Sequence, residues 1–295
     1  MKYFHGETKK NRFFEGWYIK HQAEGNIIAF IPSIHINEKG QKSASLQVIT
    51  NTASYSKDFP ATAFSAAKGR FYCKLGDTIF SQKGISINTE FEGLTIRGKL
   101  FYDNFLPLES SIMGPFQYIP FLKCNHGILS LSHKLKGYLL LNEKKLDFTN
   151  GTGYIETDWG SSFPDSYLWT QCNWYDKGDC CIMLSIAHIP FPFKSFTGCI
   201  CSIYYAGKEY RLATYLGVRI LTYTKQKVVL VQGTNKLEIK VLEQNPFPLK
   251  APVNGSLKRS IQESAFGTVK YRFSNNNQEI FTKISSNASF EYVGS

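Results

Sequence analysis

The sequence predicts an all-β protein made of two similar halves. Most of the 295 residues fall into short runs in which apolar and polar side chains alternate, and Gly, Asp or Asn separates one run from the next. Aromatic residues make up 15% of the chain, and Tyr, Phe, Ile, Val and Thr all favour strands. Short strands at close spacing are typical of antiparallel β-barrels and β-sandwiches, so we expect little helix.

The first half is predicted to be a series of strands joined by tight turns. The opening pair covers residues 13–21 (FFEGWYIKH) and 26–36 (NIIAFIPSIHI), with a turn at Glu24 and Gly25 between them. Further strands are predicted at residues 45–50, in short runs between 59 and 101, and at 128–141 after a Pro-rich loop. We place the end of the first domain at residue 152.

Alternation assigns the side chains of the opening pair to faces, because every second residue of an extended strand points to the same side. Glu15 and Trp17 therefore share a face of the first strand. His35 shares a face of the second strand with Ser33 and Ile31, among otherwise apolar neighbours. Glu15 and His35 are candidate catalytic residues, since the protonation of titratable groups among apolar and aromatic side chains is under local control.

The second half, residues 153–295, repeats this pattern. Strands are predicted at 167–175, 181–189, 199–205, 210–218, 219–232, 236–243 and 268–273. Residues 256–263 fit either a strand or a short helix. The run SYLWTQCNWY would open the second half as FFEGWYIKH opens the first. We therefore predict two tandem β domains, residues 1–152 and 153–295.

Residues 151–175 hold the densest group of acids and aromatics in the chain. Tyr154, Glu156 and Asp158 alternate, so all three project to one face of an extended segment, with Trp159 on the other. Two carboxylates on one face repel, and burial beside aromatic rings raises the pKa of at least one, giving a neutral acid that can donate a proton. In the alternative interpretation, Asp158 caps a turn and Glu156 pairs with an Arg or Lys.

A second polar row follows in the same stretch. Trp169, Gln171, Asn173 and Tyr175 share a face of the next predicted strand. Side-chain amides and an aromatic ring lining a concave surface suit an uncharged ligand with a few polar groups. The alternative is a barrel strand whose polar atoms close a hydrogen-bond network among themselves.

Composition and charge exclude several classes of function. The net charge of +11 is spread along the chain without a basic stretch, so we predict no nucleic-acid partner and at most a peripheral contact with anionic lipid.

Seven cysteines without a CxxC pair indicate free thiols in a reducing compartment. The first residues lack the apolar core of a signal peptide, and His, Pro and Lys interrupt the most apolar region. We therefore expect a cytoplasmic protein without a membrane span.

The sequence carries no familiar cofactor or metal motif. The glycine pair in GTGYIE has Glu where a dinucleotide-binding loop has its third glycine, and no helix pattern follows. Walker, HExxH and GxSxG motifs are absent. Four histidines lie in or beside predicted strands without metal-ligand spacing, His35, His126, His133 and His188. We predict neither a cofactor nor a metal site.

Eight short motifs spread over the chain form a recognisable set. They are FEGWY at 14–18, GPF at 114–116, NHG at 125–127, LSH at 131–133, GYIETDWGSSFP at 153–164, WTQCN at 169–173, SIAHIP at 185–190 and ATYLG at 213–217. This set resembles the tocopherol cyclase family and covers nearly the whole chain. The resemblance implies a pair of lipocalin-like β-barrels, related to carotenoid hydratases. It also implies a reaction in which an isoprenoid quinol closes onto its prenyl double bond to give a chromanol.

The implied reaction suits the predicted pocket. Protonating a trisubstituted alkene requires a strong, desolvated acid and surroundings that tolerate a tertiary carbocation. Asp158 or Glu156 would be the proton donor, and the ring of Trp17, Trp159 or Trp169 would stabilise the cation. The predicted substrate-binding residues are these three tryptophans together with Tyr18, Tyr154, Gln171 and Asn173.

Two other functions stay open. The barrel pattern and the lack of a known catalytic triad also fit a lipocalin-like carrier that binds an apolar small molecule without transforming it. Paired acids and aromatic side chains fit a carbohydrate-active β protein less well. For the cyclase and the carrier alike, the expected partner is an apolar small molecule.

Overall fold

The computed structural model describes residues 2–120, 122–174, 180–190 and 195–294. Across these ranges the regular secondary structure is β-strand apart from four short 3-10 helices, with no α-helix, so the predicted all-β fold is confirmed. Residues 256–263 belong to a strand, β21 (Ser256–Asn275), and not to a helix. Tyr175, expected to extend the polar row of its strand, lies outside the described residues. None of the helices described is long and apolar enough to cross a membrane.

The chain forms two compact units that do not follow sequence order. The first unit contains Met1–Leu108, Lys123–Phe163 and Pro248–Ile261, and the second contains Glu109–Leu122, Pro164–Phe247 and Gln262–Ser295. The division differs from the predicted one at residues 152 and 153. The reason is that β12 (Thr152–Gly160), which begins there, pairs with strands of the first unit on both of its edges.

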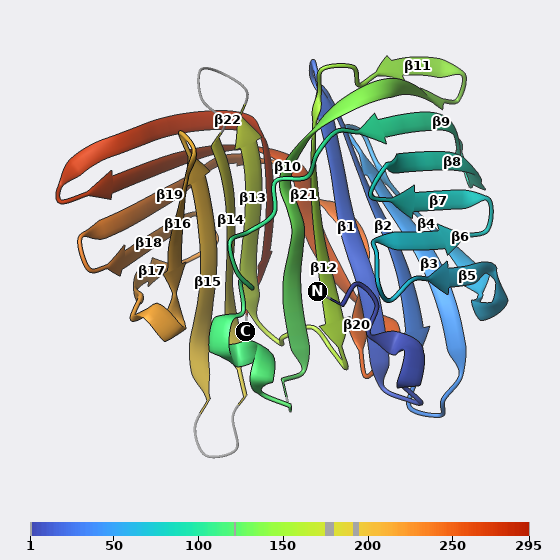
Figure 1. Ribbon diagram of the computed structural model, residues 1–295, viewed down its shortest axis with the longest axis horizontal. Coiled ribbons are helices and arrows are strands. Elements are labelled where there is room, and N and C mark those ends of the chain that lie inside the picture. The colour runs from blue at the N-terminus through green and yellow to red at the C-terminus, as the bar shows by residue number, and fades with distance from the viewer. Residues whose placement is uncertain (1, 121, 175–179, 191–194, 295) are drawn as a thin grey trace. The chain divides into compact units, whose positions relative to one another are not determined.

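The first sheet has twelve antiparallel strands in the order β4-β3-β2-β1-β12-β10-β9-β8-β7-β6-β5, and β11 pairs with β10 (Figure 1). Besides β12, the strands are β1 (Phe13–Ala23), β2 (Asn26–Ile36), β3 (Lys42–Thr50), β4 (Ser54–Pro60), β5 (Phe64–Ala66), β6 (Tyr72–Leu75), β7 (Thr78–Ser81), β8 (Gly84–Phe91), β9 (Leu94–Tyr102), β10 (Cys124–Leu141) and β11 (Lys144–Asp147). The 3-10 helices of this unit are η1 (Gly6–Thr8) and η2 (Ala61–Ala63).

The second sheet has ten strands in the order β16-β15-β14-β13-β22-β21-β19-β18-β17, and β20 pairs with β21. Besides β21, the strands are β13 (Tyr167–Trp174), β14 (Cys180–Ile189), β15 (Phe196–Tyr205), β16 (Lys208–Ala213), β17 (Arg219–Tyr223), β18 (Lys227–Gln232), β19 (Asn235–Gln244), β20 (Phe247–Val253) and β22 (Gln278–Val293). The 3-10 helices are η3 (Gly114–Tyr118) and η4 (Thr214–Leu216). None of the seven cysteines forms a disulfide, as predicted.

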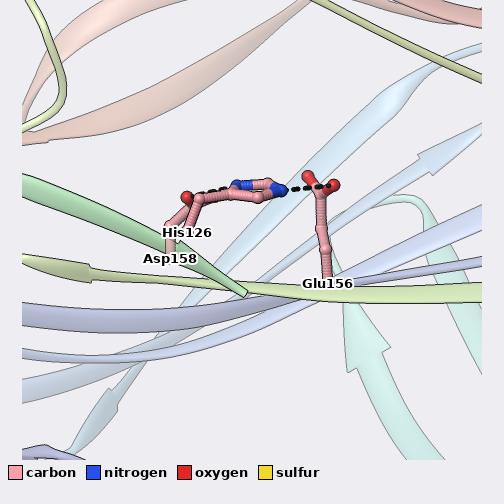
Figure 2. Close-up of side chains that lie close together, drawn as sticks. All are labelled: His126, Glu156 and Asp158. Carbon is pink, nitrogen blue, oxygen red and sulfur yellow. Dashed lines mark hydrogen bonds and ion pairs between the residues drawn. The ribbon is translucent and has the colours of Figure 1, made fainter. Parts of the chain in front are cut away.

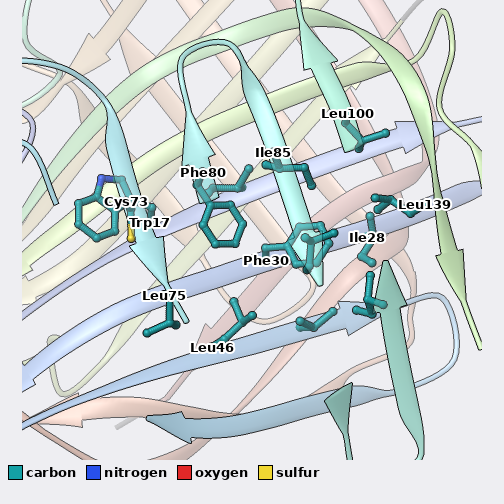
Figure 3. Close-up of a cluster of buried hydrophobic side chains, with 14 of the residues drawn as sticks. Trp17, Ile28, Phe30, Leu46, Cys73, Leu75, Phe80, Ile85, Leu100 and Leu139 are labelled. Atoms are coloured by element: carbon teal, nitrogen blue, oxygen red, sulfur yellow. The ribbon is translucent and has the colours of Figure 1, made fainter. Parts of the chain in front are cut away.

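The central strands of the first sheet bury both of their faces. One face carries Trp17 and Ile155, which belong to a hydrophobic core that also contains Phe30, Leu46 and Phe80 (Figure 3). Burying an apolar side chain of this size stabilises the fold by about 1.5–3 kcal/mol. Because a slip of one residue would turn these side chains out of the core, the core fixes the register of the strands. The residues that alternate with them are held on the opposite face, which is polar.

The segment Pro248–Ile261 is anchored to the first unit by hydrogen bonds. The Gln47 side chain in β3 donates to the Lys250 carbonyl at 3.0 Å and accepts from the Lys250 amide at 2.8 Å. The Asn254 amide donates to Ser162 Oγ at 2.8 Å, just beyond the end of β12. Gly255 follows with φ +72°, and a Cβ built on it would lie 2.0 Å from the carbonyl oxygen of Ile36. The turn at Gly255 therefore lies so close to the backbone of β2 that a residue with a side chain would not fit there.

We expect Gly255→Ala to destabilise the first unit more than Gly25→Ala. Gly25 in the β1–β2 turn has a similar φ of +81° but no atom within 4 Å of its built Cβ, so it serves as the matched control. Both variants bear the left-handed backbone strain of about 1–2 kcal/mol. Overpacking should add about 1–3 kcal/mol for Gly255→Ala alone. Urea unfolding measures both; equal losses in the two variants would contradict the close approach.

Candidate active site

The side chain of His126 lies between two carboxylates (Figure 2). Its Nδ1 is 2.8 Å from Asp158 Oδ1, and its Nε2 is 3.4 Å from Glu156 Oε2. The two acids come from β12 and the histidine from β10. On the far side of Glu156, the Tyr154 hydroxyl donates a hydrogen bond to Oε2 at 2.5 Å. Four side chains that can bind or release a proton thus form one continuous chain of contacts.

Strand pairing explains this arrangement. Tyr154, Glu156 and Asp158 alternate along β12, so they share a face, as the sequence predicts. His126 is directly opposite Asp158 in the antiparallel pair of β10 and β12. The Cβ atoms of opposite residues in such a pair lie about 4.5–5.5 Å apart, which brings the ring and the carboxylate into contact. A register shift in β10 follows only after Ile128, so the pairing at His126 is regular.

Burial and charge together control the protonation of the cluster. Burial alone would lower the pKa of His126, but the charges of Asp158 and Glu156 outweigh this effect and raise that pKa to about 10. Burial raises the pKa of Glu156, and the charge of Asp158 adds to this against the lowering effects of His126 and Tyr154. At neutral pH, His126 is therefore an imidazolium, and the pKa of Glu156 lies above that of an ordinary carboxyl group.

Solvent distinguishes the two carboxylates. The side chain of Glu156 is 4% exposed, whereas that of Asp158 is 24% exposed. Asp158 also accepts a weak hydrogen bond from the Cys124 thiol at 3.9 Å, and burial raises the pKa of that thiol well above its usual value. Asp158 is thus the partly hydrated carboxyl group that contacts His126 at Nδ1, while Glu156 is the dry carboxyl group.

The structure separates the other predicted site residues of the first unit. Tyr18 lies on the face of Glu156, to which it is directly opposite. Glu15, Trp17 and Trp159 lie on the opposite face, where Trp17 belongs to the hydrophobic core. Neither of these tryptophans is therefore on the side of the sheet that carries Glu156.

Glu15 has its own partner on that opposite face. Its carboxylate is fully buried and accepts hydrogen bonds from the His5 amide at 2.7 Å and from His5 Nδ1 at 2.8 Å. The His5 ring stacks on Trp159 with centroids 3.9 Å apart. Burial raises the pKa of Glu15, against the lowering effect of His5. This pair fastens the segment before β1 to the sheet.

The remaining predicted residues form two further polar groups. His35 lies in the first unit, within hydrogen-bond distance of Ser33 and Ser45. In the second unit the predicted binding residues lie on β13, where the Gln171 amide donates to Asn173 Oδ1. Trp169 is buried on the same face of β13. Alternation thus correctly predicted that Trp169, Gln171 and Asn173 share a face of β13. In the structure these residues belong to the second unit, whereas Glu156 and Asp158 belong to the first.

His126 is the member of this side-chain cluster that the sequence did not single out. It was recognised only as a histidine beside a predicted strand, in the NHG motif. Its contact with Asp158 joins residues 32 positions apart and depends on the pairing of β10 with β12. The only sequence signal is that the NHG and GYIETDWG motifs occur together.

One group of His, Cys, Asp or Glu side chains within the described residues has the spacing of a metal site. In His126, Glu156 and Asp158 the candidate ligand atoms all lie within 4.8 Å of one another. A metal needs a deprotonated imidazole, however, and both nitrogens of His126 face carboxylates that favour the imidazolium. The donor set therefore fits a proton better than a divalent ion.

Fold and site together define the class: an all-β, lipocalin-like protein with an imidazole, a phenol and two carboxyl groups gathered on one buried sheet face. The family model described as tocopherol cyclase-like matches residues 102–295. Since this match covers more than half of the chain, the protein belongs to the tocopherol cyclase-like family. The resemblance seen in the sequence motifs is thereby confirmed.

Known proteins that are similar to this chain include one from a plant and one from a bacterium. It is 22% identical over 171 residues to "Probable tocopherol cyclase, chloroplastic" of Oryza sativa subsp. japonica, which covers 55% of this chain and 36% of that protein. The match therefore spans little more than a third of the relative's length. A crystal structure of a "putative AttH" from Nitrosomonas europaea has a TM-score of 0.55 and 13% identity, covering 95% of this chain and 93% of that one. At this low sequence identity, the similarity to the second protein shows only that the two folds are alike.

The raised pKa of His126 predicts a pH-dependent contribution to stability. The pKa rises from 6.5 to about 10 in the folded state, so the folded protein binds this proton more tightly than the unfolded chain. The stabilisation is complete below pH 6.5 and is lost as the pH rises toward 10. We expect the difference in unfolding free energy between the wild type and His126→Asn to shrink over that interval. Urea unfolding at pH values from 6 to 10 measures this difference in unfolding free energy. A difference that stays constant over that range would contradict a protonated His126.

The same protonation predicts weak metal binding. Protein expressed with added zinc and dialysed at neutral pH should retain no stoichiometric zinc by mass spectrometry, because a metal would have to displace the proton of His126. His126→Asn serves as the control. One equivalent of zinc that is retained by the wild type and lost in this variant would establish a metal site.

Proposed function

We propose that the protein is a cofactor-independent cyclase that protonates an alkene of an isoprenoid quinol or a similar long, apolar substrate, with Glu156 as the proton donor. The observation that carries this proposal is the buried Glu156 carboxyl, whose pKa is raised while a hydroxyl and an imidazolium contact it. Membership of the tocopherol cyclase-like family supports the class of reaction.

The proposed reaction is an isomerisation. Neutral Glu156 gives its proton to one carbon of the substrate double bond, and the π electrons of that bond form the new C–H bond. The other carbon becomes a tertiary cation. A lone pair of the quinol hydroxyl oxygen then forms the C–O bond and closes the ring, and the oxygen releases its proton. Atoms and charge balance without an oxidant, a reductant or a second substrate.

The neighbours of Glu156 lower the cost of the first step. A carboxyl group is a weak acid toward an alkene, so stabilisation of the carboxylate left behind matters most. The His126 imidazolium, 3.4 Å from Oε2, and the Tyr154 hydroxyl both interact more strongly with a carboxylate than with the neutral acid. Asp158 keeps His126 charged and oriented.

Aromatic rings on the same face suit the cation. Tyr18 and Tyr154 lie on the face that carries Glu156, and both are buried. Electron-rich rings stabilise a nearby cation by about 0.5–2 kcal/mol. We therefore assign to these two tyrosines the role first expected of Trp17 and Trp159, which lie on the other side of the sheet.

We expect Glu156→Gln to lower kcat about 10²–10⁴-fold, the usual contribution of a general acid. Asp158→Asn should have a smaller effect, because Asn still accepts the hydrogen bond of His126 but removes the charge that holds its proton. Glu15→Gln changes an equally buried carboxyl group on the opposite face and should leave kcat nearly unchanged. Turnover of a prenylated methylhydroquinone, followed by chromatography and mass spectrometry, measures all three.

Two outcomes would count against this assignment. Full turnover by Glu156→Gln would exclude Glu156 as the donor. Recovery of the bound quinol unchanged after long incubation with wild-type protein would favour the carrier function over catalysis.

A further inference from the structure

A second polar cluster lies on the same face of the first sheet as Glu156. Ser33 Oγ is 2.9 Å from His35 Nε2 and 2.8 Å from Ser45 Oγ, and His35 Nε2 is 3.3 Å from Ser45 Oγ. All three side chains are buried. Burial lowers the pKa of His35 to about 4, so its ring is neutral and can accept a proton through Nε2. The reaction proposed above leaves this cluster without a role.

Strand pairing places the two clusters in one row. Ser45 is opposite Ser33, Ser33 is opposite Gly16, Gly16 is opposite Asp158, and Asp158 is opposite His126. Residues directly opposite one another in antiparallel strands point to the same face. The row therefore carries a serine–histidine cluster at one end, the acid cluster at the other and a glycine between them.

Gly16 places no side chain between the two clusters. Among the described residues of the first unit, a Cβ built on Gly16 would come within 4 Å of only Ser33 Cβ, at 3.3 Å, and the Pro32 carbonyl oxygen, at 3.6 Å. Gly16 and Asp158 are both partly exposed, whereas Ser33 is 4% exposed. Ile31, also partly exposed, adds an apolar side chain on the same face. Solvent thus reaches the row only partly, at Gly16 and Asp158, beside side chains that are buried.

Ser33 has capacity for one more hydrogen bond. A hydroxyl group offers one donor and two acceptor sites. In the tautomer of His35 that leaves Nε2 without a proton, Ser33 Oγ donates to that nitrogen and, more weakly, to the Ser45 carbonyl at 3.5 Å, and it accepts from Ser45 Oγ. These bonds use the donor and one acceptor site. The acceptor site that remains suits the O–H group of a ligand lying over Gly16.

We propose that Ser33, backed by His35 and Ser45, receives the ring-closing hydroxyl of the substrate across Gly16 from Glu156. This inference rests on the cyclase function proposed above and names the part of the substrate that each cluster recognises. Ser33 and Glu156 are two strands and two residues apart, or roughly 12 Å between Cα atoms. Their side chains reach into that interval and leave room for a hydroxyl group at one end and a double bond at the other.

The cluster also supplies a route for the released proton. As the hydroxyl oxygen forms the C–O bond, its proton passes to Ser33 Oγ, and Ser33 passes its own proton to His35 Nε2. An oxygen that has just bonded to a carbocation is a strong acid, so a weakly basic imidazole suffices as the acceptor. His35 then loses the proton to solvent, and Glu156 regains one from solvent, which restores both groups.

The test compares two unreactive probes by calorimetry. One is a methylhydroquinone with a saturated prenyl chain, and the other is the same compound with the hydroxyl next to the chain methylated. We expect Ser33→Ala to weaken binding of the free quinol about 10-fold, the loss of one buried hydrogen bond, and to leave binding of the ether unchanged. Gly16→Ala should weaken binding of both probes, because its methyl group fills the accessible space.

Ser130→Ala is the matched control. Ser130 is a fully buried serine in β10 whose Oγ lies 3.0 Å from the ring of another histidine, His133, so loss of its hydroxyl tests for a general effect of removing such a bond. It should change neither binding nor turnover. Ser33→Ala should also lower kcat/KM for the reactive quinol at least 10-fold while its unfolding curve stays near that of the wild type.

The outcomes separate this inference from the proposed function. If Glu156→Gln abolishes turnover but Ser33→Ala binds both probes like the wild type, the hydroxyl site is wrong and the cyclase proposal stands. If Glu156→Gln keeps full turnover while Ser33→Ala still discriminates between the probes, the hydroxyl site stands without that donor. Failure of the wild type to bind either probe would overturn the hydroxyl site.

Discussion

The pairing of β12 with β1 on one edge and β10 on the other is the constraint on which the site depends. Strand alternation gives β12 a core face, with Ile155, and a polar face, with Glu156 and Asp158. The core face fixes the register through burial of apolar side chains. Because both faces belong to the same strands, this register also fixes the positions of the side chains on the polar face. The residues of the candidate site are therefore positioned by apolar residues on the other side of the sheet.

Burying this polar group is tolerable because its charges cancel. A charged side chain taken out of water costs several kcal/mol unless it is paired and hydrogen-bonded. In the starting state of the proposed reaction Glu156 is neutral, and the imidazolium of His126 is balanced by the Asp158 carboxylate, so the cluster carries no net charge. When Glu156 gives up its proton, the cluster gains one negative charge next to a positive one. The resting state is thus electrically balanced, and the imidazolium meets the charge that the proposed reaction develops.

The sequence was most informative about faces and least informative about contacts between distant strands. Alternation alone predicted that Tyr154, Glu156 and Asp158 share a face and that Trp159 lies on the other, because this periodicity is local. The place of His126 in the cluster could not be predicted, since its contact with Asp158 requires the register of two strands, β10 and β12, that are separated in the sequence by β11. The division of the chain into its two units could not be predicted either, because it depends on hydrogen bonds between distant residues. Gln47 and Lys250, for example, are 203 positions apart.

The segment Pro248–Ile261 also imposes an order of events during synthesis. A chain emerges from the ribosome from its N-terminus, and domains ordinarily fold as soon as their residues are available. The strands of the first sheet are all present once β12 has been made, yet the segment anchored to β3 by Lys250 is translated only after most of the second sheet. The first unit can therefore be completed only after residues 164–247 of the second unit have been made.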